Sequence, residues 1–412
     1  MYDWANSAFT TTVMAGFFPI FFKHYWSASD QVHISGAKLA FGNSIAGILV
    51  AFLAPVLGAI SDNSGKKTRF LLFSTLTGSL GCIGLFFISA GDWQNAILFY
   101  IVASIGFFSA NIFYDSMLTD VVKSEKYYDK VSAAGFSVGY LGGGILFALN
   151  VWWTLMPDLF GFADKSSAVR ASFISAGIWW FVFGIPLMVY GPYTAKKKKF
   201  GIQIIQAGFK QIRHTFREIR NLKVVFTFLL AYWLYIDGVD TIIRMAVDYG
   251  LSIGFTQTDL ITALLMIQFL GFPFTWLSGI LAEIIGRKRM IYITIFGYIC
   301  ICIWASFMRN KIEFYGIALL ISMFQGGIQA LSRSYFASLI PADKSAEYFG
   351  FYNMLGKFAA IIGPALMGAV NLIAGYFIND SVLAVRAGML SIVLLFIAGG
   401  ITLSKVNAKT NT

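Results

Sequence analysis

Long apolar runs separated by short polar segments dominate this chain. Each run is about 20 residues or more, the length of helix that crosses the hydrocarbon core of a bilayer. Runs this long without strict alternation indicate helices and not barrel strands, because backbone groups in hydrocarbon must be bonded internally. We therefore predict an all-α membrane protein with twelve transmembrane helices, at residues 4–24, 37–60, 69–90, 94–121, 131–153, 169–191, 223–247, 258–282, 289–308, 314–339, 347–373 and 384–404.

Two similar polar hairpins interrupt this pattern about half a chain apart, between spans 2 and 3 and between spans 8 and 9. Both contain a glycine, a carboxylate, a second glycine and then cations, at Gly58, Asp62, Gly65, Lys66 and Lys67, and at Gly279, Glu283, Gly286 and Arg287. We expect two pseudo-symmetric six-helix bundles, at 1–193 and 223–412, joined by a cytoplasmic linker at 194–222. A repeated six-helix plan is typical of an alternating-access transporter.

Cations are concentrated in the loops on one side of the predicted helices, including both hairpins and the linker. This bias predicts that both termini lie in the cytoplasm. In the linker, apolar residues recur at steps of three and four among lysines and arginines, which predicts a basic amphipathic helix at the membrane surface. A solvated linker with one apolar face is the alternative. The net charge of +11 thus follows from membrane orientation, and we predict no nucleic-acid partner.

Composition removes several other classes of function. Hydrophobic residues make up 58% of the chain and charged residues 12%. Cys82, Cys300 and Cys302 lie inside apolar runs, where a buried small hydrophobic role is the usual one, and the three histidines are scattered. We see no Ser/His/Asp set, metal cluster or nucleotide-binding loop, so we predict no enzyme activity, no metal and no cofactor. The first span lacks a basic start and a cleavage site, so we expect it to be retained.

Charges inside the predicted spans are the main candidates for function, because each costs about 2.5 to 3.5 kcal/mol to insert. Asp115 in span 4 and Arg333 in span 10 occupy matching positions of the two repeats. They predict an ion pair between the bundles or a site for a zwitterion, with a permanent structural salt bridge as the alternative. In span 7, Asp237, Asp240 and Arg244 share one helix face. Asp240 and Arg244 can neutralise one another, which leaves Asp237 to bind a proton or an amine.

Further polar residues complete the predicted pathway and its gate. Lys357 in span 11 lies deep in the helix, where it either functions or extends to the surface. Asp3 and Asn6 open span 1 at the predicted cytoplasmic surface, where Asp3 either caps the helix or belongs to a gate or a substrate contact. Neutral hydrogen bonds to a polar solute are expected from Asn111, Tyr114, Gln325 and Gln329.

With these residues in view, the chain resembles the major facilitator superfamily. The first hairpin matches the loop motif of that superfamily, and the second is its weaker partner. More specific segments resemble the fungal autophagy-related vacuolar amino-acid effluxers and their bacterial relatives. These segments are Tyr2-Asp3-Trp4-Ala5-Asn6-Ser7-Ala8, Gly139-Tyr140-Leu141-Gly142-Gly143-Gly144, Tyr235-Ile236-Asp237-Gly238-Val239 and Gln325-Gly326-Gly327-Ile328-Gln329-Ala330-Leu331-Ser332-Arg333-Ser334.

The resemblance also has departures. Drug/proton antiporters of the superfamily usually carry an arginine in the middle of span 4 and Gly-Pro in span 5. Here span 4 has Asn111, Tyr114 and Asp115 instead, and Gly363-Pro364 occurs in span 11. These departures weaken a drug-antiporter interpretation.

The resemblance implies efflux of amino acids or similar small polar metabolites by alternating access, with proton coupling through Asp115 or Asp237 as a hypothesis. It also implies that Asp62 is a latch that contacts the start of span 11 near Glu347 and holds the cytoplasmic side closed. The alternatives are transport of a drug, lipid or siderophore, or a receptor or assembly protein that does not transport. We expect a monomer with membrane lipids, a small-molecule substrate and protons as partners, in a bacterial cell membrane, or in a vacuolar membrane if the source is eukaryotic.

Overall fold

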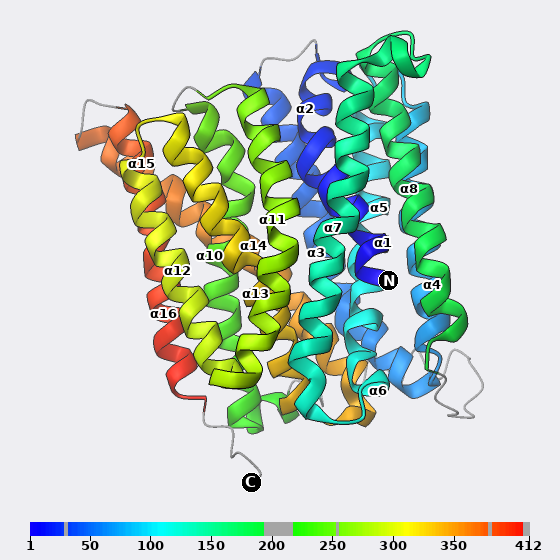
Figure 1. The fold of residues 1–412 in the computed structure, drawn as a ribbon, viewed down its shortest axis with the longest axis vertical. Helices are drawn as coiled ribbons and strands as arrows, with labels where there is room; N and C mark the ends of the chain where they lie inside the picture. The colour runs from blue at the N-terminus through cyan, green and yellow to red at the C-terminus, as the bar shows by residue number, and fades with distance from the viewer. Residues whose placement is uncertain (29–31, 193–216, 253–254, 378–380, 407–412) are drawn as a thin grey trace.

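The computed structural model describes residues 1–28, 32–192, 217–252, 255–377 and 381–406. Within these residues, twelve helices are long and apolar enough to cross a membrane. Each coincides with one of the twelve predicted spans, so the predicted all-α membrane fold is confirmed. Figure 1 shows the helices standing side by side in one bundle, with the chain start partway up it.

The N-terminal half contributes six spans. The first span runs through α1 (Tyr2–Ala8), η1 (Phe9–Phe17), α2 (Phe18–Phe21) and η2 (Phe22–Trp26). The second is α3 (Val32–Ser64), the third is α4 (Lys67–Gly84) with η3 (Leu85–Phe87), and the fourth is α5 (Trp93–Ser116) with α6 (Leu118–Val121). The fifth is η4 (Glu125–Tyr127) with α7 (Tyr128–Leu155), and the sixth, after η5 (Pro157–Phe160), is α8 (Lys165–Tyr190). Within the first span, η1 and η2 are π-helical, and Ser27 N–H bonds Phe22 C=O five residues back. Nothing in the sequence pattern predicted this winding.

The C-terminal half contributes the other six spans. They are formed by α10 (Lys223–Ser252), α11 (Gln257–Ile285), α12 (Arg287–Phe307), α13 (Lys311–Leu339), η6 (Ala342–Lys344) with α14 (Ser345–Phe377), and α15 (Ser381–Ser391) with α16 (Val393–Ser404). The last span, predicted as one helix, is interrupted at Ile392. The predicted linker helix lies almost wholly in residues 193–216, outside the described part, so the division at 194–222 stays a prediction.

Each half has its own apolar core, and the halves meet along a few helices. One core is built around Phe18, Phe147 and Trp180, and the other around Tyr298, Phe349 and Phe396. Between the halves, α3 packs along α14 and α7 packs along α11. The approach of α3 to α14 is very close, because a Cβ added at Gly58 would lie 2.2 Å from the carbonyl oxygen of Ala346.

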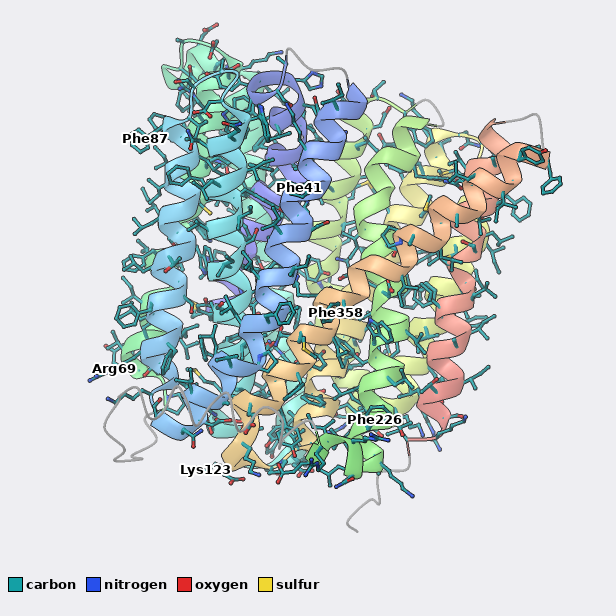
Figure 2. The ribbon with its side chains drawn as sticks, turned by 180° about the vertical axis from the view of Figure 1, so that it is seen from behind. Phe41, Arg69, Phe87, Lys123, Phe226 and Phe358 are labelled. Atoms are coloured by element: carbon teal, nitrogen blue, oxygen red, sulfur yellow. The ribbon has the colours of Figure 1, made fainter. Side chains whose placement is uncertain are left out.

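Both polar hairpins lie at the same end of the bundle, the lower end in Figures 1 and 2, where Figure 2 labels Arg69 and Lys123. We call it the hairpin end. Gly65 and Gly286 form the two turns with φ of +66° and +93°, a backbone conformation that glycine adopts without strain. The turns are therefore short enough to place each hairpin directly against the other half of the molecule.

Candidate functional site

The first hairpin binds the start of α14. Asp62, in the last turn of α3, is 7% exposed, and its carboxylate accepts the backbone N–H of Glu347 at 2.7 Å. The first N–H groups of a helix have no partner within it and attract an anion. The contact expected between Asp62 and span 11 is thus present, and it joins the two halves.

Lys67 extends this contact into a network. Its buried amine donates to Asp120 and to Ser345 Oγ, each at 2.7 Å, and lies 3.7 Å from Asp62. The neighbouring Lys66 differs, since it is half-buried and its backbone N–H bonds Ser64 Oγ. Of the two predicted gate lysines, Lys67 is therefore the one that ties the halves together through its side chain.

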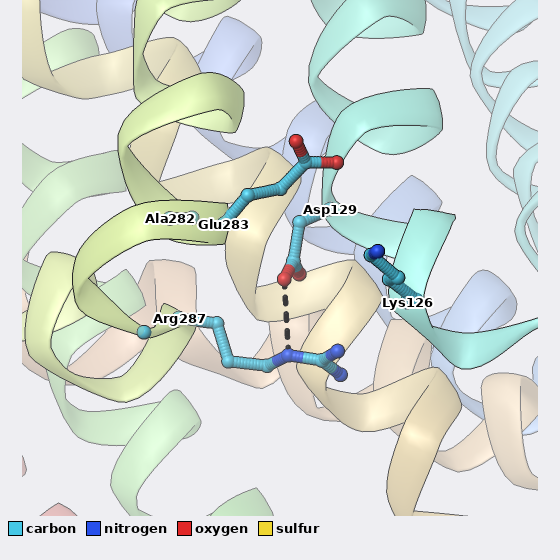
Figure 3. A pocket seen from close by; sticks show the side chains of 6 residues that line it. Lys126, Asp129, Ala282, Glu283 and Arg287 are labelled. Atoms are coloured by element: carbon cyan, nitrogen blue, oxygen red, sulfur yellow. Dashed lines mark ion pairs between the residues drawn. The ribbon is translucent and has the colours of Figure 1, made fainter.

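The second hairpin meets the start of α7 by a different chemistry. Arg287 Nε lies 3.1 Å from the carboxylate of Asp129, which also accepts a hydrogen bond from Ser334 Oγ. Figure 3 shows Arg287 reaching across a small pocket toward Asp129, with Glu283 and Lys126 on its walls. The first hairpin therefore presents an anion to helix N–H groups, whereas the second presents a cation to an acidic side chain.

A buried ionic cluster joins the halves deeper in the bundle, centred on Arg333 of α13. Its guanidinium lies 3.3 Å from Asp115 of α5 and 3.7 Å from Asp3 of α1. It also donates to the side chain and the carbonyl of Ser132 on α7, at 2.9 and 3.1 Å. Two carboxylates from the N-terminal half thus face one cation from the C-terminal half.

Asp3 lies elsewhere than the sequence suggested. We expected it at the cytoplasmic surface, as a helix cap or as part of a gate or a substrate contact. The structure has Met1 at the N-cap with no capping bond from a side chain, and Asp3 is 6% exposed beside Arg333 and Tyr114. The expectation of a surface position was wrong, because the Asp3 side chain is buried between α5 and α13, inside the bundle.

Neutral polar side chains surround the ionic cluster. The hydroxyl of Tyr114 donates to Asp3, and Arg333 lies 5.2 Å from the Tyr114 ring. Asn6 donates to Asn111 at 2.9 Å. These contacts bring together four of the residues singled out in the sequence on α1 and α5, next to the guanidinium.

Asn353 is a member of this cluster that sequence reasoning missed. Its side-chain amide donates to Asp115 at 3.1 Å and so connects α14 to α5. The sequence contained a signal for it, because Asn353 is a polar residue inside the predicted span 347–373 and lies one turn before Lys357. Two more residues were missed: Ser132, in the first turn of the predicted span at 131–153, and Asp129, which lies just before that span.

Asp237 forms a second buried site, on α10. Its side chain is 1% exposed, and one carboxylate oxygen accepts the Gly363 N–H of α14 at 2.9 Å. The other oxygen has no hydrogen-bond partner among the described residues. Asp240 is half-buried one turn away, and the Arg244 side chain lies outside the described residues, so the expected pairing of these two stays a prediction.

The remaining candidates lie on α13 and α14. Gln325 interacts with Tyr140 of α7, and Gln329 is half-buried one turn further along α13. The amine of Lys357 is 2.9 Å from the centre of the Phe108 ring on α5, a cation–π contact between the halves. Lys357 therefore faces the N-terminal half and does not extend toward the hairpin end.

Comparison with solved structures places this fold in a known class. Human organic anion transporter MFSD10 matches with a TM-score of 0.71 at 12% identity, covering 98% of this chain and 97% of its own. FucP, a major facilitator transporter solved in the outward conformation, matches with a TM-score of 0.69 at 12% identity, covering 99% and 98%. This likeness shows that the twelve spans, with charges buried between two halves, have the fold of the major facilitator superfamily.

Sequence comparison gives the family within that class. The family described as Vacuole effluxer Atg22 like matches residues 1–411, and this chain belongs to it. An MFS-type transporter of Bacillus subtilis, YxiO, whose function is uncharacterised, is 38% identical over the whole chain and 94% of its own length. Autophagy-related protein 22 of Eremothecium gossypii is 23% identical, over 80% of this chain and 70% of its own. The resemblance drawn from the four sequence segments is thereby confirmed.

Proposed function

We propose that this transporter exports amino acids by alternating access and that a proton gradient drives the export. The observation that carries the proposal is the cluster of Asp3, Asp115 and Arg333. An amino acid is a zwitterion, so its site needs a cation for the carboxylate and an anion for the ammonium group. Arg333 supplies a planar pair of donors suited to a carboxylate. With two carboxylates facing one guanidinium, one negative charge remains for an ammonium group.

The position of the cluster supports a role in the transport cycle. Its carboxylates belong to α1 and α5 and its guanidinium to α13, so the halves cannot separate there without breaking the ion pairs. A bound zwitterion would replace the lost partners on both sides, because its two charged groups match the groups that are exposed. Substrate binding would in this way offset the cost of rearranging the halves.

The hairpins supply the gate in this proposal. Asp62 and Lys67 hold α14 against the N-terminal half, and Arg287 holds the second hairpin against α7. Both contacts lie at the hairpin end, which we assign to the cytoplasm from the distribution of lysine and arginine. Breaking them would open the pathway to the cytoplasm and admit the substrate.

The direction and the coupling rest on two further observations. The family description names an effluxer, and the chain resembles amino-acid effluxers in four segments, which supports export. Asp237 and Asp115 are carboxyl groups within spans, and such groups commonly mark proton pathways. We assign proton uptake to Asp237 first, because one of its oxygens has no partner among the described residues.

Counterflow in proteoliposomes tests the substrate class. Vesicles loaded with unlabelled amino acid should accumulate the same labelled amino acid, and Arg333→Met should abolish this accumulation. The compounds for this assay are selected by a screen of amino acids, drugs, lipids and siderophores for ligands that raise the Tm of the protein. Counterflow of one of the other compounds and of no amino acid would reject the substrate assignment. A protein that binds no solute and moves none would instead be a receptor or an assembly protein.

A further inference from the structure

One face of α5 is accessible over several turns, although the rest of that helix is buried. Over residues 103–116, the half-buried positions recur at steps of three and four, and every other position is buried. These positions are Ile105, Phe108, Asn111, Tyr114 and Asp115. Residues at such steps share one helix face. The face includes Asp115 of the ionic cluster, so its other side chains lie next to the site proposed for the zwitterion.

Two further polar contacts lie on this face beyond the ionic cluster. One turn from Asp115, the side-chain oxygen of Asn111 accepts a hydrogen bond from Asn6 at 2.9 Å. Two turns from Asp115, the amine of Lys357 lies 2.9 Å from the centre of the Phe108 ring. The face therefore presents an ionic cluster, then an amide pair, and then a cation on an aromatic ring.

Helix α14 holds Lys357 on this face. Asn353, one turn before Lys357, donates to Asp115, so the same side of α14 contacts α5 at both positions. Helix α5 approaches the hairpin end near Lys123, whereas α14 begins there, so the two helices run in opposite directions. Figure 2 labels Phe358, the residue after Lys357, about midway between the two ends of the bundle. The Lys357 amine thus lies further from the hairpin end than Asp115 does, deep in the membrane, where a charge is costly and usually functional.

The groups beyond the cluster offer hydrogen-bond donors. A lysine amine has three N–H donors and no acceptor. The oxygen of Asn111 is engaged by Asn6, so this amide offers its N–H groups to a ligand. Donors of this kind bind an oxygen, which can belong to a carboxylate or to an amide. A substrate held by its two α-groups at the cluster would therefore place a side-chain oxygen near Lys357 and Asn111.

The spacing along α5 sets the length of that side chain. Seven residues separate Phe108 from Asp115, or about 10.5 Å at a rise of about 1.5 Å per residue. Glutamate and glutamine have four bonds between Cα and the terminal oxygen, which is about 5 Å when extended. A hydrogen bond adds about 3 Å at each end, so these two amino acids span the distance. Aspartate and asparagine are one bond and about 1 Å shorter.

We propose that Lys357 and Asn111 bind the end of the substrate side chain, and that the substrates are five-carbon amino acids with a terminal carboxylate or amide, glutamate and glutamine. This inference rests on the proposed function, since the ionic cluster must hold the ammonium and carboxylate groups on Cα. A carboxylate forms the stronger, charge-assisted bond with Lys357. An amide uses its oxygen at the same donors without that charge.

Counterflow in proteoliposomes tests the side-chain site. The KM is measured for L-glutamate, L-glutamine, L-aspartate, L-asparagine and L-leucine, each as the labelled substrate. Glutarate, which has the two carboxylates of glutamate but no ammonium group, is added as a competitor. We expect the KM of glutamate, of glutamine or of both to be about ten- to a hundredfold lower than that of leucine, because leucine lacks the bond to the donors. The four-carbon pair should have intermediate values.

Ratios of KM between two substrates, measured in one variant, do not depend on how much of the protein folds. Lys357→Met should remove a preference for glutamate over leucine, and Lys357→Arg, which keeps a cation, should retain most of it. Asn111→Leu should remove a preference for glutamine over leucine. Lys165→Met is the matched control, since it removes an exposed lysine at the start of α8, and it should leave both ratios as they are in the unmodified chain.

A KM for leucine at or below those of both glutamate and glutamine would overturn the side-chain site. A preference that persists in both Lys357→Met and Asn111→Leu would do so too, and so would an aspartate KM as low as that of glutamate. Failure of the proposed function looks different, because then no amino acid shows counterflow. Counterflow of leucine without glutamate or glutamine keeps amino-acid transport and removes the side-chain site. Glutarate that competes as well as glutamate keeps the side-chain site and rejects the zwitterion site.

Discussion

At the scale of single residues, the molecule is defined by charges that it buries and pairs between its halves. Arg333 is 4% exposed and faces Asp3 and Asp115. Removing one member of a buried ionic set leaves the others charged and without compensation, which is far more costly than the gain from forming the set. The energetic value of the cluster is therefore seen best when a single partner is removed.

Replacing Arg333 with methionine should lower the free energy of unfolding by about 3 to 5 kcal/mol, because two buried carboxylates lose their cation. Arg333→Lys is the matched variant, since it keeps the charge but not the planar pair of donors, and it should lose less. Thermal unfolding of the purified protein in detergent measures both. Equal Tm values for the methionine variant and the unmodified protein would show that the cluster does not hold the halves together.

The sequence predicted part of this site and missed part of it. Arg333, Asp115 and Asp237 were found because a charge inside an apolar run is costly and therefore visible. The depth of Asp3 was not predicted, since periodicity gives no information on how deep a residue lies among neighbouring helices. Asn353 was overlooked because a neutral amide costs less to bury than a charge. Its pairing with Asp115 depends on how α14 crosses α5, which only the structure gives.

At the scale of elements, we propose that the contacts made by the two hairpins decide which end of the bundle is closed. Apolar length and polar turns were sufficient to predict the twelve spans. The π-helical winding of the first span and the interruption at Ile392 were not predicted, because both depend on packing and not on hydrophobic period. The contact between Asp62 and the start of α14 followed from the superfamily resemblance, together with the general attraction of helix N-termini for anions.

Asp62→Asn should open the hairpin end, because the charge that binds both the Glu347 N–H and Lys67 is lost. We expect the ratio of open to closed forms to rise about tenfold, as a hydrogen bond to a charged group contributes about 1.5 to 3 kcal/mol. Spin labels attached at Arg69→Cys and Ala342→Cys, two exposed positions at the hairpin end, measure this ratio through the distance between them. Lys66→Ala is the matched control in the same turn. An unchanged ratio in Asp62→Asn would show that Asp62 does not hold the hairpin end closed.

At the scale of the whole molecule, we propose that two six-helix bundles rock about the contacts between them, with the hairpin end in the cytoplasm. The fold and family are those of major facilitator transporters. The orientation is a prediction from the loop cations, and it decides whether opening the hairpin end serves export or import.

Labelling of intact cells with a membrane-impermeant thiol reagent tests the orientation. In the chain without native cysteines, Ala163→Cys, exposed between α7 and α8, should react from outside. Ala342→Cys, exposed at the hairpin end, should react only after the cells are made permeable. The reverse pattern would place the hairpin end outside, and the proposed direction of transport would then be wrong.

Amino-acid flux in proteoliposomes under an imposed pH gradient tests proton-coupled export most directly. The gradient should drive net flux by the unmodified protein. The pH dependence of flux should be lost in Asp237→Asn, in Asp115→Asn or in both, and counterflow of the substrate should continue in Asp237→Asn. If neither variant alters the pH dependence of amino-acid flux, these carboxyl groups do not carry the coupling proton and the central claim is contradicted.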